Sequence, residues 1–171
     1  MVSVVAARAF YSLGMPSNYA SFLLLAGLLA GSAHADSALS LRAAESLAES
    51  ARSACKGLGR EVAVAVVDAS GQTLMLSRSP AVGPHNLEAA RRKAFTALST
   101  RQSTLALGRQ ARSQPDTAAL QYLPELLLLG GGVSLKRGDA VVGALGVAGG
   151  GGPENDDACA GTAAAIFAAQ P

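Results

Sequence analysis

The chain has 171 residues, of which 50% are hydrophobic, 15% are charged and 4% are aromatic, and this size and composition predict one small globular domain. The formal net charge of +2 argues against a protein that holds nucleic acid through a broad basic face. We therefore expect its partners in a pocket or at an interface.

The N-terminal segment has the pattern of a secretory signal. Its first 21 residues carry one charged residue, Arg8, and an uninterrupted apolar run follows over residues 22–31. This run is too short to span a bilayer as a mature helix. Ala33 and Ala35 then supply the small residues that a signal peptidase requires. The pattern predicts cleavage after Ala35.

Cleavage divides the chain into a signal peptide, residues 1–35, and one mature domain, residues 36–171. We expect this domain to be periplasmic or secreted and to have no membrane contact after cleavage. Either Met1 or Met15 can be the start of the chain, since both starts keep the apolar run and the cleavage pattern. The alternative is an uncleaved membrane anchor.

Few residues of the mature domain can bind a metal. His85 is its single histidine, which excludes a site built from a cluster of imidazoles. The two cysteines, Cys55 and Cys159, would mature in an oxidising compartment, where a pair of thiols usually forms a disulfide. Two buried free thiols are the alternative, because the sequence does not show their geometry.

The first half of the mature domain predicts a helix followed by a β-hairpin. Apolar residues recur at steps of three and four over residues 39–56, Ser40 can cap this helix, and Gly57 ends it. Residues 61–68 are almost all apolar and β-branched, as in a central strand. Turn residues then separate this strand from a second one over residues 72–78.

A loop and two helices are expected next. Two prolines and a glycine exclude regular structure over residues 79–86, and Asn86 is placed to cap a helix over residues 87–100. The following polar segment predicts a short helix near residues 103–110 and then a loop to residue 118.

The C-terminal part predicts three strands and a final helix. The strands cover residues 125–129, 133–136 and 140–147, and a tight turn at residues 137–139 joins the last two. A glycine run leads into a helix over residues 153–168, whose first turn is acidic. This order of elements favours an α+β domain in which helices cover a largely antiparallel sheet.

Two glycine segments are candidates for ligand binding. Gly130, Gly131 and Gly132 follow an apolar strand, and residues 149–152 precede the final helix, whose N-terminus can hold an anionic group. Neither segment has the spacing of a nucleotide-binding loop. Tight turns that need positive φ explain both segments equally simply, and taken alone that interpretation is favoured.

His85 is the strongest candidate for chemistry. It lies in a Pro- and Gly-rich loop before a basic helix, where it can ligate a haem iron while Arg91, Arg92 and Lys93 pair with propionates. The alternative is a solvent-exposed histidine beside a solvated helix face, and from these residues alone that interpretation is favoured. A single histidine and the absence of a G-x-S-x-G motif argue against hydrolase machinery, and the sequence shows no evident catalytic centre.

The order of several motifs resembles the GlcG/HbpS haem-binding family, whose domain also forms the C-terminal part of PduO-type adenosyltransferases. The likeness extends over residues 38–169. It is carried by V-x-V-x-D-x-x-G before a short strand, A-R-R-K-A-F-T-A (residues 90–97), L-G-G-G-V (129–133), D-x-x-V-G-A-L-G-V-x-G-G (139–150) and the acidic start of the final helix.

This resemblance implies a profilin-like α+β domain with a five-stranded antiparallel sheet flanked by helices, usually assembled into homo-oligomers. It implies haem or tetrapyrrole binding, and haem degradation by the family label alone. The ligand-proximal positions that it carries over are Lys93, Thr96 and Gly130–Gly132. Ser134 departs from the pattern, because the family commonly has proline there.

Three functions follow from these observations. The first is an exported haem-binding protein for haem capture, storage or sensing, with His85 leading Tyr122 and Met75 as the axial ligand. The second is a small accessory enzyme or binding factor for an organic acid or corrinoid, with the glycine segments as an anion cradle and Lys93 or Arg92 as the charge. The third is a structural subunit that assembles through its Ala-rich helices.

Overall fold

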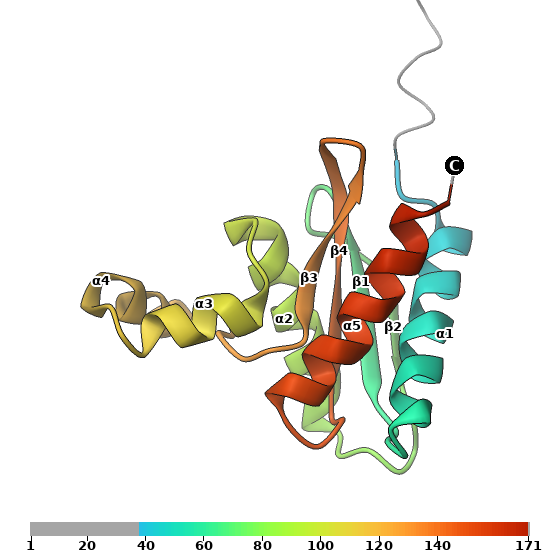
Figure 1. Ribbon diagram of the computed structural model, residues 1–171, viewed down its shortest axis with the longest axis horizontal. Helices are drawn as coiled ribbons and strands as arrows, with labels where there is room; N and C mark the ends of the chain where they lie inside the picture. Colours follow the sequence, from blue (N-terminus) through green and yellow to red (C-terminus); the bar gives the residue numbers. More distant parts are fainter. Residues whose placement is uncertain (1–37, 171) are drawn as a thin grey trace, which may run out of the picture. The chain divides into compact units, whose positions relative to one another are not determined.

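The computed structural model describes residues 38–170 (Figure 1), so the predicted signal segment and its cleavage site lie outside the described residues. The centre of the fold is a four-stranded antiparallel sheet with the strand order β2-β1-β4-β3. The strands are β1 (Ala63–Asp68), β2 (Thr73–Arg78), β3 (Gly132–Arg137) and β4 (Ala140–Ala148).

Helices cover both faces of this sheet. The first helix, α1 (Leu41–Gly57), and the last, α5 (Pro153–Ala168), lie side by side on one face, and α2 (His85–Thr100) packs on the other (Figure 1). Alternation along β1 explains the two layers, since Val64 and Val66 contact the α1/α5 side and Ala63 and Ala65 contact the α2 side.

Two glycines let α2 approach the sheet closely. Gly132 and Gly146 are directly opposite each other on β3 and β4. A Cβ atom at Gly146 would lie 2.0 Å from the Ala90 carbonyl oxygen, and one at Gly132 would lie 2.2 Å from the Lys93 carbonyl oxygen. The backbone of α2 therefore rests directly on the backbone of the two strands, with no side chain between them.

An arm of short helices extends away from the sheet after α2 (Figure 1). It consists of α3 (Thr104–Ala111), α4 (Pro115–Ala118) and the 3-10 helix η1 (Ala119–Tyr122). The predicted short helix is confirmed as α3, and the segment expected as a loop after it contains α4. Tyr122 at the end of the arm is 79% exposed.

The α+β class and the antiparallel sheet flanked by helices are confirmed, but the expected count of five strands is wrong. Residues 125–129 form no strand, although their leucines make an apolar run. The reason is a set of side-chain hydrogen bonds to this backbone: the Leu127 N–H donates to Thr96 Oγ1 at 2.8 Å, and the Arg92 guanidinium donates to the Leu126 carbonyl. The profilin-like assignment stays a prediction.

The start of α2 also differs from the prediction. The helix begins at His85 with Pro84 as its N-cap, so Asn86 lies inside the first turn. Its side-chain amide donates back to the Gly83 carbonyl at 3.1 Å and does not accept from the helix, as a cap would. The expected cap at Ser40 is confirmed, because its side chain accepts from the Ala43 N–H.

A disulfide between Cys55 and Cys159 joins α1 to α5. Their Cα atoms are 5.3 Å apart, and both side chains are buried in the core beneath the two helices. The structure therefore decides for the disulfide and against two free thiols. Among residues 38–170, no helix is long and apolar enough to cross a membrane.

Candidate functional site

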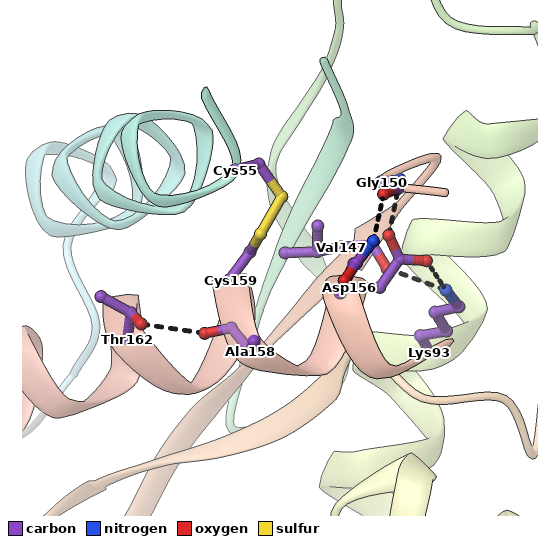
Figure 2. The surroundings of a disulfide bond; sticks show 9 residues. Cys55, Lys93, Val147, Gly150, Asp156, Ala158, Cys159 and Thr162 are labelled. Carbon is purple, nitrogen blue, oxygen red and sulfur yellow. Dashed lines mark hydrogen bonds and ion pairs between the residues drawn. A yellow bond between two sulfur atoms is a disulfide. The ribbon is translucent and has the colours of Figure 1, made fainter. Parts of the chain in front are cut away.

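Lys93 is buried and paired inside the protein. It is 1% exposed, and its ammonium group contacts Asp156 Oδ2 at 2.7 Å and the Val147 carbonyl at 2.9 Å (Figure 2). Burial lowers the pKa of Lys93, and the nearby charge of Asp156 opposes that effect. The pair connects α2 to the start of α5 and to the end of β4.

Asp156 is the residue of this site whose role in a buried ion pair the sequence analysis did not predict. Its second carboxylate oxygen accepts from the Gly150 N–H at 2.7 Å, and its side chain is 6% exposed (Figure 2). In the sequence, the acidic first turn of the final helix fits the helix dipole, which explains exposed acids and does not require burial. Only the nearby glycines, which leave room for a buried carboxylate, could have indicated this position.

The amide groups of Gly131 and Gly132 donate within the chain. The Gly132 N–H donates to Thr104 Oγ1 at 2.8 Å, and the Gly131 N–H lies 3.4 Å from Asp157 Oδ1. Burial raises the pKa of Asp157, an effect that its contact with Gly131 opposes. A Cβ atom at Gly130 would lie 2.5 Å from the Pro153 carbonyl oxygen. The amides of Gly131 and Gly132 therefore support the turn and are not free to form an anion cradle.

Thr96 is buried as well, and it holds the backbone around it. Its hydroxyl donates to the Arg92 carbonyl at 2.7 Å and accepts from the Leu127 N–H at 2.8 Å. The structure thus brings Lys93, Thr96 and Gly130–Gly132 together, but as the packed contact between α2, β3 and α5. A ligand would reach these side chains only if that contact opened.

His85 differs from this cluster because it is exposed. It is the first residue of α2, two helical turns before Lys93, and its ring lies near Gly83. Arg92 follows seven residues later, on the same face and about 10 Å along the helix axis. Its Nε is buried and has no hydrogen-bond partner among the described residues.

The remaining residues expected to contact a haem are the propionate partner Arg91 and the candidate axial ligands Met75 and Tyr122. Arg91 is bound to Glu88 at 2.8 Å, Met75 is partly buried in β2, and Tyr122 is exposed at the end of the arm. Within residues 38–170, no three His, Cys, Asp or Glu side chains gather as a metal site. His85 and Tyr122 are therefore the donors that an external group can contact without any rearrangement.

A family model described as "Haem degrading protein HbpS-like" matches residues 39–165, which is most of the chain. The chain belongs to this family. No curated protein matches the HbpS-like chain, whereas several solved structures do. A double mutant of HbpS from Streptomyces reticuli is 31% identical, with a TM-score of 0.70 and 98% of each chain covered.

Two further structures resemble the HbpS-like chain. One is a complex of PduOC with haem, which is 32% identical with a TM-score of 0.68, over 75% of this chain and 94% of that one. The other is protein ORFY from Klebsiella pneumoniae, which is 26% identical with a TM-score of 0.70, over 77% and 92% of the two chains. The resemblance inferred from the motifs is therefore confirmed.

Proposed function

We propose that this HbpS-like protein binds haem at the exposed start of α2. The observation that carries the proposal is a similar solved structure, the PduOC complex, which contains haem and is 32% identical to this chain. Among residues 38–170, His85 is the single histidine and its side chain is exposed, and imidazole is a common axial ligand of haem iron.

The residues around His85 fit such a group in one respect, because the imidazole is exposed and can reach an iron. Arg92 lies on the same face of α2, but its guanidinium donates to the Leu126 carbonyl and its Nε is buried, so it would meet a propionate only if this contact opened. Bound haem would supply an iron centre at this position. Lys93 and Thr96 would act by fixing α2 against the sheet and not by contacting the haem, because both are buried and bonded.

Titration of the full chain with hemin tests the proposal. We expect a saturable Soret shift, and we expect the substitution His85→Ala to abolish it or to change its position. Tyr122→Phe is the matched control, because Tyr122 is the other exposed donor and lies on the arm, so its loss should leave the spectrum unchanged.

Each outcome has a distinct meaning. A wild-type chain that shows only non-saturable hemin adsorption would contradict haem binding. A saturable shift that is identical in His85→Ala would leave haem binding in place and remove His85 as the ligand. A shift lost in Tyr122→Phe and kept in His85→Ala would move the site to the arm.

The proposal includes export and a role in haem capture, storage or sensing. Support for export comes from the sequence pattern of residues 1–35 and from the disulfide, because disulfides persist in oxidising compartments. Residues 1–35 would be cleaved, leaving a periplasmic or secreted domain. Mass measurement of the chain recovered from a secreting host tests the cleavage site directly.

A further inference from the structure

The first two turns of α5, residues 153–160, lie against the buried Lys93. Asp156 of this segment contacts the Lys93 ammonium group at 2.7 Å, and a Cβ atom at Gly131 would lie 2.8 Å from the Asp156 Cβ atom. We call residues 153–160 the α5 cover. Lys93 becomes accessible to water and to ligands if the cover lifts, because Asp156 then leaves its ammonium group.

Few side chains anchor the α5 cover to the core. The cover contains no Val, Leu, Ile, Met or aromatic residue, and its buried side chains are those of Asp156, Cys159 and Ala160. Glu154 lies 3.5 Å from Arg109, but both side chains are mostly exposed, so this ion pair contributes little. The main anchors of the cover are therefore Asp156, through its ion pair with Lys93, and Cys159, through its disulfide.

The ion pair alone is a weak anchor. Lys93 and Asp156 both lose their hydration when the cover closes, and this cost offsets much of the attraction between the two charges. The same cost of burial lowers the pKa of Lys93. Water would hydrate both groups again if the cover lifted.

The start of α5 is also weakly capped. Its N-cap residue is Gly152, which supplies no side-chain hydrogen bond to the first turn, and glycines occupy all four positions from 149 to 152. Unwinding of the first two turns would leave the second half of α5 in place, because Ala163 and Phe167 are buried there. The cover can thus open while the rest of the helix stays packed.

The disulfide prevents this opening. Cys159 follows Asp156 by three residues, so the two side chains are neighbours on α5, and Cys159 is bonded to Cys55 of α1 (Figure 2). A Cβ atom at Gly150 would lie 2.7 Å from Asp156 Oδ1 and 3.5 Å from Cys55 Sγ. The bond and the carboxylate therefore pack against the same turn, and the bond fixes the backbone one helical turn from Asp156.

We propose that the disulfide between Cys55 and Cys159 is a latch that keeps the α5 cover closed over Lys93, and that the cover opens when the two cysteines are thiols. Closing the latch removes two electrons and two protons from the two thiols. A small-molecule disulfide such as oxidised glutathione accepts them and becomes two thiols. Lys93 is then exposed before this oxidation and buried after it. This inference does not depend on haem binding.

The three lysines of the chain make the state of the cover measurable. Acetic anhydride acetylates exposed amines, and mass spectrometry of the digested chain gives the rate at each lysine. Lys56 and Lys136 are exposed and serve as internal references. We expect Lys93 in the full wild-type chain to react about tenfold faster or more when the disulfide is reduced, while the rate at Lys136 stays the same.

Two variants complete the experiment. The double variant Cys55→Ala and Cys159→Ala should show the fast rate at Lys93 without any reductant. Leu47→Ala is the matched control, because it removes a buried side chain of α1 and destabilises the whole chain, as loss of the disulfide does, but keeps the bond. Lys93 should react in this control about as slowly as in the oxidised wild-type chain.

Hydrogen exchange of the backbone amides separates opening of the cover from unfolding. In the reduced chain and in the double cysteine variant, residues 153–160 should lose protection while residues 63–68 of β1 keep it. Lys93 that stays unreactive without the disulfide would overturn the proposal. Equal reactivity of Lys93 in Leu47→Ala, or a loss of protection in β1 together with the cover, would overturn it as well, because the whole chain would then open and not the cover.

Discussion

At the residue scale, the buried ion pair between Lys93 and Asp156 holds three elements together. Lys93 belongs to α2, Asp156 to α5, and the carbonyl that Lys93 also contacts belongs to Val147 of β4. A buried charge is costly unless its partner and its hydrogen bonds are all present. Removing either side chain would therefore leave the other as a buried charge without its partner.

The substitution Lys93→Met should lower the free energy of unfolding by about 3–5 kcal/mol, because it leaves the Asp156 carboxylate buried without its cation. Lys93→Met combined with Asp156→Asn should recover part of this loss, since the neutral amide still offers an acceptor to the Gly150 N–H. Urea unfolding measures both values.

Lys136→Met is the control for this experiment, because Lys136 is exposed and its loss removes a lysine without exposing a buried charge. A Lys93→Met variant as stable as this control would show that the pair contributes nothing to stability.

At the element scale, Gly132 and Gly146 help to set the position of α2. Their missing Cβ atoms let the helix backbone lie on the sheet, and Ala90 and Ala94 complete the contact with small side chains. The residues at the start of α2, including His85, are oriented by this contact.

Gly146→Ala should lower the free energy of unfolding by about 1–3 kcal/mol or more, because the added methyl group overlaps the Ala90 carbonyl and pushes α2 away. Gly57→Ala provides the comparison, since a Cβ atom at the end of α1 meets nothing within 4 Å. Thermal unfolding of the two variants checks this expectation, and equal midpoints would contradict it.

The sequence predicted most elements because their signals are local. The hairpin of β1 and β2, the apolar periodicity of α1 and the cap at Ser40 each depend on residues a few positions apart. The prediction of a strand at residues 125–129 is wrong because periodicity cannot show that Thr96, some thirty residues earlier, would form a hydrogen bond with this backbone.

The candidate site was predicted less completely for the same reason. The motif positions Lys93, Thr96 and Gly130–Gly132 do meet in space. The sequence could not show that Asp156, 63 residues after Lys93, would form an ion pair with the lysine. A basic side chain near a glycine segment is equally typical of an anion site and of an internal ion pair. Only the burial of the basic side chain, which the structure shows, distinguishes an internal ion pair from an anion site.

At the scale of the whole molecule, the disulfide links the first and the last helix. Its cysteines are 104 positions apart, so it closes a loop that contains the entire sheet. A cross-link over so long a loop reduces the conformational freedom of the unfolded chain substantially.

Replacing both Cys55 and Cys159 with alanine should therefore lower the free energy of unfolding by about 4–5 kcal/mol. Denaturant unfolding with and without a reducing agent provides the check. Reduction should destabilise the wild-type chain by a similar amount and leave the double variant unchanged. A wild-type chain insensitive to reduction, with all thiols accessible after unfolding, would contradict the bond.

The same bond has a consequence for the arm of α3, α4 and η1. Everything between the two cysteines lies inside one covalent ring, and the arm is the part of that ring that extends from the body (Figure 1). A protease that cut the arm once would open the ring but release no fragment. The two pieces would stay tied through α1 and α5 until a reductant separated them.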